Sequence, residues 1–208
     1  MILALDMAST FGWALWSPQE GGSWRLVGHG HLTASAEDRR PGVLGHYDQA
    51  WAVIDLLQKH IRTLNLPRRT SVVVEDTNIG GRAGRSSQKM LEFIHCLLIQ
   101  QLGPYHKLEY VTTRQWHSWI GLALSQADRD NNKLLSQIRR KLREKLRRKP
   151  TPKELSEAKK AAGIEGKRTI KHASVEWANR TYGLQLAMKD EDEADAICIG
   201  SGYIRSLS

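Results

Sequence analysis

The first third of the chain alternates short apolar runs with polar turns. Ile2–Met7 is an apolar run that contains one acid, Phe11–Trp16 is a second run, and Trp24–Leu32 alternates apolar and polar residues with glycines. Runs of this length between turn residues are typical of strands. The pattern predicts a meander of three strands, with turns at Ala8–Thr10 and Ser17–Ser23.

The next segments alternate between helix and strand. Apolar residues recur at three- and four-residue steps over Val43–Leu64, which predicts an amphipathic helix. Ser71–Glu75 is a β-branched run of the kind found in strands covered on both faces, and Leu108–Thr112 predicts a further strand. A strand, helix, strand order implies parallel pairing. The expected fold class is α/β, with a mixed five-stranded sheet flanked by helices.

The helix expected over Ser87–Leu102 is apolar around most of its circumference. Such a helix has to be buried on two sides. The second side is either core or a subunit interface. The chain continues with five further expected helices, over Arg114–Leu124, Asn131–Arg148, Pro152–Ala162, Arg168–Tyr182 and Asp192–Leu207. Thr151 and Glu154 match a capping box at the start of the third of these.

Charge is unevenly distributed along the chain. The net charge is +9, and residues 122–171 carry 16 basic and 6 acidic residues, a balance of +10. The rest of the chain is close to neutral. A basic segment on a neutral body indicates a polyanion partner, for which nucleic acid is the first candidate and an anionic membrane surface the second.

Composition excludes several other classes. The 208 residues, 40% of them hydrophobic, suit one globular domain with an appendage. No apolar stretch reaches the length of a membrane span, and Asp6 interrupts the apolar start, so we expect neither a membrane segment nor a signal peptide, and a cytosolic protein. Cys96 and Cys198 lack metal-ligand spacing, which excludes a zinc finger, and are predicted to be small core residues.

Acidic residues stand at unusual positions in three elements. Asp6 lies inside an apolar strand, Glu75 ends another, and Asp192 and Asp195 lie three apart on one face of the last helix. A buried carboxylate costs several kcal/mol (about 3–5) unless it is paired or binds a cation. Mg²⁺ takes oxygen ligands from few carboxylates and from phosphate. Two such ions about 4 Å apart are a standard device for hydrolysing a phosphodiester.

Each acid also has a structural interpretation when it is taken alone. Asp192 could cap its helix, and acids in a first turn gain from the helix dipole. Glu75 could be an ordinary strand-end acid beside a loop. Asp6 is harder to explain in this way, because a strand interior is unfavourable for an unpaired acid. The joint occurrence on three elements favours a metal site.

These residues resemble a known family. Asp6 followed by Gly12-Trp13, the strand ending in Glu75, and Asp192-Glu-Ala-Asp195-Ala are similar to the acidic motifs of RuvC-type Holliday junction resolvases, which belong to the ribonuclease H-like superfamily. The resemblance implies a ribonuclease H-like sheet and an endonuclease whose catalytic residues Asp6, Glu75, Asp192 and Asp195 hold two Mg²⁺ ions, with Mn²⁺ expected to substitute. It also implies a homodimer that cuts two strands of a four-way DNA junction symmetrically.

The sequence departs from the family at two places. Some cellular members carry an aromatic wedge three residues after the second acid, where this chain has Asn78. Compact cellular enzymes lack the basic Leu122–Lys167 insertion, which looks more like the phage-encoded or divergent branch. We therefore expect one nuclease domain over residues 1–208 with a helical insertion at about 122–167, acting in a bacterial or phage-infected cell at the nucleoid.

Basic residues near these motifs are candidates for phosphate contacts. The glycine-rich loop after Glu75 permits close backbone approach to DNA, and the insertion places cations on nearly every face of a helix. The candidates for nucleic-acid binding are Arg82, Arg85, Lys89, Arg114, Lys167, Lys171, Arg139, Arg140, Arg143 and Arg147. The eight histidines show no ligand spacing, and only His172 is considered as an active-site auxiliary. The tryptophans are interpreted mainly as core.

Three other functions remain open on the sequence. A nuclease of the same fold could act on other branched DNA, on R-loops or on RNA–DNA hybrids. A nucleic-acid-binding module without catalysis would be expected to have a broken acidic set, whereas all four positions here are acidic. An actin-like ATPase also carries an acid in its first strand, but no glycine-rich phosphate loop follows Asp6.

Overall fold

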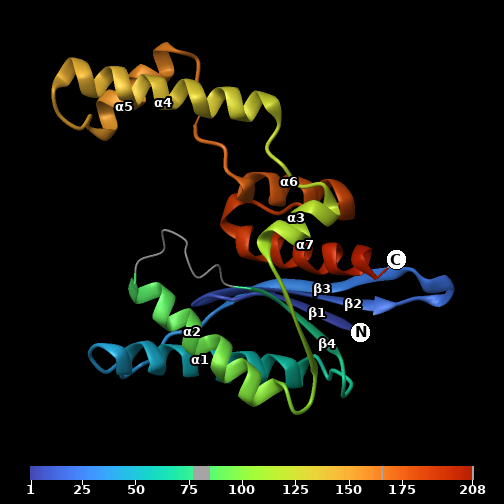
Figure 1. Ribbon diagram of the computed structural model, residues 1–208. Helices are drawn as coiled ribbons and strands as arrows, with labels where there is room; N and C mark the ends of the chain where they lie inside the picture. Colours follow the sequence, from blue (N-terminus) through green and yellow to red (C-terminus); the bar gives the residue numbers. More distant parts are fainter. Residues whose placement is uncertain (77–84, 165, 208) are drawn as a thin grey trace. The chain divides into compact units, whose positions relative to one another are not determined.

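The computed structural model describes residues 1–76, 85–164 and 166–207, with side chains in the second helix from residue 88 onward (Figure 1). The chain divides into two compact units. The first comprises Met1–Leu122 and Ser174–Ser208, and the second comprises Ala123–Ala173. Among the helices described, none combines the length and the apolar character that crossing a bilayer requires.

The first unit is built on a mixed five-stranded sheet with the strand order β3-β2-β1-β4-β5. The first three strands pair antiparallel, and β1, β4 and β5 pair parallel. The sequence prediction of an α/β fold with this kind of sheet is confirmed. The strands are β1 (Ile2–Asp6), β2 (Thr10–Pro18), β3 (Trp24–Thr33), β4 (Ser71–Glu75) and β5 (Lys107–Val111).

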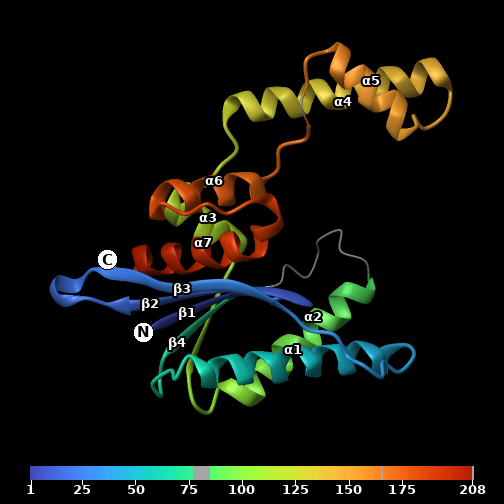
Figure 2. The same cartoon turned by 180° about the vertical axis from the view of Figure 1, so that it is seen from behind.

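Helices cover both faces of the sheet (Figures 1 and 2). One face carries α1 (Val43–Thr63) and α2 (Arg85–Leu102), and the other carries α7 (Glu191–Ser206) with α3 (Thr113–Ile120) packed on it. The remaining elements of this unit are the short helices η1 (Glu20–Gly22) and η2 (Met188–Asp190) and most of α6 (Ile170–Tyr182). The central strands are therefore buried on both sides, as their continuous apolar runs predict.

Side chains of β1 alternate between these two faces. Leu3 and Leu5 pack into the core formed with α1 and α2. Because successive strand residues point to opposite faces, Ile2, Ala4 and Asp6 point toward α7. Asp6 is thus the last residue of a strand whose inner positions are fully buried.

Helix α2 meets the sequence expectation only in part. Ile94, Leu97 and Leu98 are buried in the core shared with α1, whereas Ile99 is 54% exposed. Cys96 is also exposed, so the prediction that both cysteines are core residues is wrong for Cys96, which lies on the outer side of the helix. Cys198 is buried, and its burial raises the pKa of the thiol well above the usual value.

The largest differences from the expected helix boundaries are at the end of α3 and the start of α4. Helix α3 ends at Ile120 instead of Leu124, because Gly121 adopts a left-handed conformation (φ 68°) that terminates it. Helix α4 (Gln126–Leu146) begins five residues earlier than expected, because Ser125 caps it by accepting a hydrogen bond from the Asp128 backbone N–H at 3.0 Å.

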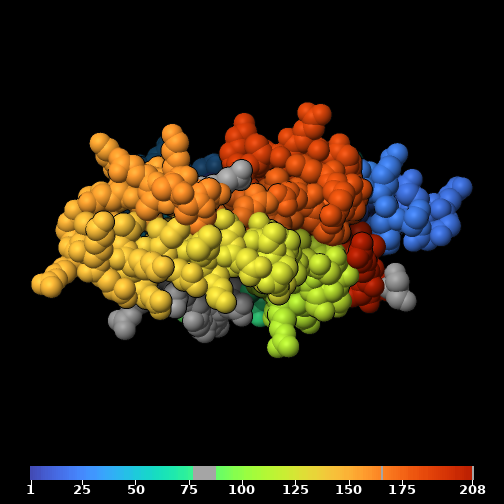
Figure 3. All heavy atoms as spheres, turned by 90° about the horizontal axis from the view of Figure 1, so that it is seen from above, coloured from blue at the N-terminus to red at the C-terminus, as the bar shows by residue number. Residues whose placement is uncertain are grey.

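The second unit consists mainly of α4 and α5 (Pro152–Ala161), which lie side by side (Figure 3). The predicted capping box of Thr151 and Glu154 is confirmed at the start of α5. Arg148 pairs with Glu154 at 2.6 Å, and this hydrogen bond lowers the pKa of Glu154 to about 2. Leu135 is buried at 2% exposure, so this unit has a small apolar centre of its own.

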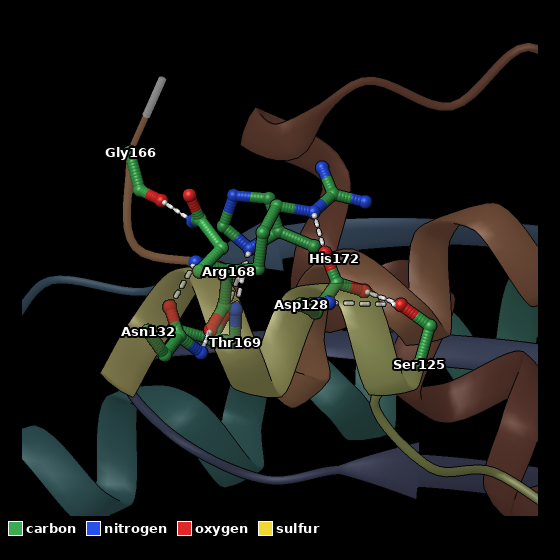
Figure 4. Close-up of polar contacts among 8 residues, drawn as sticks. Ser125, Asp128, Asn132, Gly166, Arg168, Thr169 and His172 are labelled. Carbon is green, nitrogen blue, oxygen red and sulfur yellow. Dashed lines mark hydrogen bonds and ion pairs between the residues drawn. The ribbon is translucent and has the colours of Figure 1, made fainter. Parts of the chain in front are cut away.

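Polar contacts join the two ends of the second unit (Figure 4). The Arg168 backbone N–H donates to Asn132 Oδ1 at 3.0 Å, and Asn132 Nδ2 donates to the Arg168 carbonyl at 2.7 Å. Arg168 also pairs with Asp128 at 3.2 Å, and hydrogen bonding from Ser125 together with the charge of Arg168 lowers the pKa of Asp128. Hydrogen bonds and an ion pair thus hold the segment where the chain enters this unit against the segment where it leaves.

Candidate metal centre and nucleic-acid surface

Two of the predicted metal ligands end neighbouring parallel strands. The register of β1 and β4 pairs Leu5 with Val74, so Asp6 and Glu75 are the next residues along each strand. Parallel strands place their carboxyl ends at the same edge of the sheet. Glu75 shares its face with Val73, and Asp6 shares its face with Ala4. The fold therefore brings these two acids to one edge and one face.

Gly12 places the start of α7 beside them. Gly12 pairs with Asp6 across β1 and β2. A Cβ atom built on Gly12 would lie 1.8 Å from the carbonyl oxygen of Asp192 and 2.7 Å from the backbone nitrogen of Glu193. The helix backbone therefore rests directly on the strand at this position, which only glycine permits. Asp192, in the first turn of α7, consequently lies next to β2, the strand whose Gly12 pairs with Asp6.

The fourth acid follows one helical turn later. Asp195 is 7% exposed. Burial of the Cys198 thiol is the main cause of its raised pKa, and the negative charge of Asp195 raises that pKa further. Asp192 does not cap the helix, because the N-cap residue is Asp190. The structural interpretation of Asp192 as a helix cap is therefore excluded. Its place in the first turn remains favourable for an acid.

Thr113 holds Glu75 in place. Its hydroxyl donates a hydrogen bond to Glu75 Oε1 from the first residue of α3. The start of α3 is itself fixed by a capping box between Thr112 and Gln115. Thr113 was not among the site residues predicted from the sequence, although it lies two residues after β5, the strand that pairs with β4. Arg114, a predicted DNA contact, comes next and is exposed.

The acidic residues fit divalent cations by their donor set. All four side chains supply carboxylate oxygens, the ligands that Mg²⁺ and Mn²⁺ prefer. Asp195 is buried and Asp6 and Glu75 are half-buried, and a divalent cation bound at this edge would offset the mutual repulsion of their carboxylates. The absent side chain of Gly12 is what lets α7 bring its two acids to that edge. We therefore regard Asp6, Glu75, Asp192 and Asp195 as able to hold the expected ions.

A second group of ligand-type side chains lies at the start of α7. His29 Nδ1 makes a hydrogen bond with Glu193 Oε1, and His31 Nδ1 lies 3.5 Å from Glu193 Oε2. These two histidines were not singled out from the sequence as candidate site residues. Residues two apart on a strand share a face, and the His29-Gly-His31 spacing is the signal that could have identified them.

Residues of α4, of the start of α5 and of the segment between them form a basic hollow within the second unit. A cavity of about 850 Å³ is lined by Arg139, Arg140 and Arg143 of α4 and by Lys149, with Ser136, Leu155 and the 150–152 segment completing it. The three arginines are exposed, and Arg147 ends α4 in a left-handed conformation (φ 51°). Cations are therefore gathered around one concave surface.

The other candidates for DNA contact belong to both units. Lys89 is exposed on α2, and Lys167 is exposed in the second unit, to which Lys171 also belongs. Arg82 lies outside the described residues, as does Asn78, and only the backbone of Arg85 is described, at the first turn of α2.

His172 has a structural contact that the sequence did not indicate. Its Nδ1 accepts a hydrogen bond from the Thr169 backbone N–H at 3.3 Å and lies 2.8 Å from the Thr169 hydroxyl (Figure 4). Because Thr169 immediately precedes α6, these bonds satisfy the start of that helix.

Comparison with known proteins bears on the fold. No protein-family model matches the chain, and no curated protein matches it in sequence. Thermus thermophilus RuvC in complex with a Holliday junction substrate superposes with a TM-score of 0.58 at 8% identity, over 99% of this chain and 94% of that one. This chain has the RuvC-type resolvase fold. A second Thermus thermophilus RuvC structure gives 0.54 at 10% identity over the same shares. The yeast mitochondrial Holliday junction resolvase Ydc2 gives 0.49 at 13% identity, over 98% of this chain and 77% of that one.

Proposed function

We propose that this protein is a metal-dependent endonuclease that cleaves branched DNA, with the four-way junction as its substrate and a role in DNA recombination and repair. The observation that carries the proposal is the convergence of Asp6, Glu75 and the start of α7 on one edge of a RuvC-type fold, around Gly12. A solved structure of the same fold contains a Holliday junction substrate, which makes that substrate the first one to test.

The chemistry assigned to each residue follows from its position. Mg²⁺ ions, when bound, would supply the activated water and the stabilisation of the leaving oxygen. Asp6 and Glu75 are rigid ligands because each ends a strand paired on both sides. Thr113 orients Glu75 by its hydrogen bond. Asp192 and Asp195 would complete the set from the helix that packs on β2, and the exposed Arg114 would contact the DNA backbone.

Cleavage of labelled DNAs tests the proposal. Four-way, three-way, flap and linear DNAs of equal length, together with an R-loop and an RNA–DNA hybrid, are incubated with the protein and Mg²⁺, and the cut positions are mapped. We expect paired nicks at symmetric positions of the four-way junction, and no cleavage with the metal chelated. Preferred cleavage of an R-loop or an RNA–DNA hybrid would support the second candidate function, a nuclease of the same fold with another substrate. Absence of any cleavage would contradict both.

The basic hollow is proposed to bind DNA phosphates. The variant Arg139→Gln/Arg140→Gln/Arg143→Gln removes three cations that line one cavity. We expect weaker junction binding and a slope of log affinity against log salt that is shallower by about 0.9 for each DNA phosphate that the variant no longer neutralises. The measurement is fluorescence anisotropy over a range of salt concentrations.

A matched variant distinguishes the effect of these three arginines from the effect of lowering the net charge of the protein. Arg25→Gln/Arg62→Gln/Arg68→Gln removes the same charge from exposed positions of the first unit. It is expected to change affinity and slope much less. Equal effects of the two variants would mean that the cations of α4 act only through net charge.

We further propose a homodimer that uses the outer side of α2. Ile99 and Cys96 are exposed on that side, opposite the residues that pack on α1. A symmetric pair of active sites suits the two equivalent cleavage points of a four-way junction. Ile99→Glu is expected to convert the dimer to a monomer in light scattering, whereas Val27→Glu, at an exposed apolar position of β3, leaves the dimer intact. A wild-type monomer both with and without junction DNA would contradict the dimer.

A further inference from the structure

Three side chains at the start of α7 form a tight group of ligand atoms. Within residues 1–76, 85–164 and 166–207, one atom each from His31, Asp190 and Glu193 all lie within 4.8 Å of one another. They come from β3, from the N-cap position of α7 and from its first turn, all within the first unit. Ligands bound at about 2.1 Å to one Zn²⁺ ion are at most about 4.2 Å apart. Small side-chain rotations would therefore suffice to close this group on an ion.

Glu193 differs from His31 in this group because its carboxylate is buried. Its side chain is 9% exposed, and a carboxylate in that position requires compensation. His29 supplies part of it through its hydrogen bond to Oε1, which leaves Oε2 directed toward His31 at 3.5 Å. His29 pairs with Ala14 and His31 with Gly12, so both imidazoles project from the face of the sheet on which α7 lies. The carboxylate is held between two histidines of one strand.

Asp190 is oriented by the backbone. Its Oδ2 accepts a hydrogen bond from the Ala187 N–H at 2.8 Å, in the short helix η2 that leads into α7. Outer partners of this kind orient metal ligands and are part of most metal sites. The His31 side chain is 41% exposed, which provides an entry path for an ion.

We propose that His31, Asp190 and Glu193 form a binding site for a transition-metal ion of the Zn²⁺ class, with His29 as the outer partner that orients Glu193. Mixed imidazole and carboxylate donors suit Zn²⁺, Co²⁺ and Ni²⁺, whereas Mg²⁺ favours oxygen donors alone. Three protein ligands leave one coordination position for water. The site uses none of Asp6, Glu75, Asp192 or Asp195.

The bound ion would fasten the start of α7 to the edge strand β3. Glu193 directly follows Asp192, and Asp195 lies two residues further on. An ion at this place therefore positions the helix turn that carries both acids. The site exists independently of the proposed nuclease activity, because its ligands and its effect on the fold require no DNA.

Metal titration of the full chain tests the site. Chelator-treated protein is titrated with Zn²⁺ by calorimetry in a large excess of Mg²⁺, and with Co²⁺ by visible absorption. We expect one Zn²⁺ per chain, a Co²⁺ spectrum typical of nitrogen and oxygen ligands, and a higher Tm with Zn²⁺. His31→Gln should weaken Zn²⁺ binding by at least about tenfold and remove the Tm shift.

Matched variants decide where the ion binds. His46→Gln changes a histidine of α1, on the other face of the sheet, and should bind Zn²⁺ as the wild type does. Asp6→Asn/Glu75→Gln removes oxygen ligands of the acidic residues and should also leave Zn²⁺ binding intact. Glu193→Gln should lose binding, and the exposed His31 position keeps the test decisive even if Glu193→Gln does not fold. No Zn²⁺ bound in excess Mg²⁺, or equal affinity of wild type and His31→Gln, would overturn the proposal.

Discussion

Asp6→Asn is expected to lower the rate of junction cleavage to about one-thousandth of the wild-type rate or less, while junction affinity stays within about twofold. A thousandfold loss corresponds to about 4 kcal/mol of transition-state stabilisation. The reason is that Asp6 is a proposed metal ligand at the end of the central strand, whereas affinity comes from Lys and Arg contacts to phosphate. Single-turnover cleavage of a labelled four-way junction and a binding titration measure the two quantities on the same preparation.

Asp55→Asn provides the control for this prediction. Asp55 is an exposed acid of α1 that pairs with Lys59 at 2.7 Å, so its replacement also removes one negative charge without touching the sheet edge. It should cleave as the wild type does. Glu75→Gln, Asp192→Asn and Asp195→Asn should behave as Asp6→Asn does. Retained cleavage by Asp6→Asn at saturating Mg²⁺ would remove the metal assignment from this edge of the sheet.

Gly12→Ala is expected to reduce both stability and cleavage, although the added group is a single methyl. Its Cβ would lie 1.8 Å from the Asp192 carbonyl oxygen, and real Cβ contacts are essentially never under 3.0 Å. Strand and helix must therefore separate by more than about 1 Å. Overpacking of this kind costs about 1–3 kcal/mol, which lowers Tm by about 2–12 °C in a chain of this size. A displacement of about 1 Å at the site can cost about 100-fold in rate.

Gly166→Ala is the corresponding control. A Cβ at Gly166 meets nothing within 4 Å, and its φ lies outside the left-handed region. Thermal unfolding and single-turnover cleavage should therefore be unchanged in this variant. Wild-type stability together with wild-type cleavage in Gly12→Ala would contradict the close seating of α7 on β2.

The sequence predicted the sheet well because its inner strands are buried on both faces. Continuous apolar runs such as Ser71–Glu75 have few alternative structures, and their ends coincide with turn residues. Helix ends were less predictable. The start of α4 is set by the Ser125 cap in a polar stretch without apolar periodicity, and the end of α3 is set by the backbone conformation of Gly121. Both are local backbone effects that hydrophobic patterning does not encode.

The candidate site was predictable where one residue conflicts with its surroundings. Asp6 and Glu75 are conspicuous because charged residues are unfavourable in apolar strands. Glu193 is not conspicuous, because it stands among other acids in a helix start, and its burial depends on contact with the histidines of β3, distant in sequence. The roles of Gly12 and Thr113 likewise depend on which elements pack together. These contacts join residues that are distant in sequence, and the pattern of hydrophobic and polar positions does not specify which distant elements pack together.

The position of α7 also has a consequence for the synthesis of the protein. The face of the sheet that carries Asp6 is covered by residues near the other end of the sequence, as the seating of Gly200 against the Trp16 ring shows. While the ribosome is still translating the middle of the chain, β1, β2 and β4 have been made but the apolar residues on this face have no cover. The acidic residues accordingly come together only after translation has passed Asp195. A nascent chain lacks the complete site, and a translation product that stops before α7 would combine an exposed apolar sheet with an incomplete set of acids.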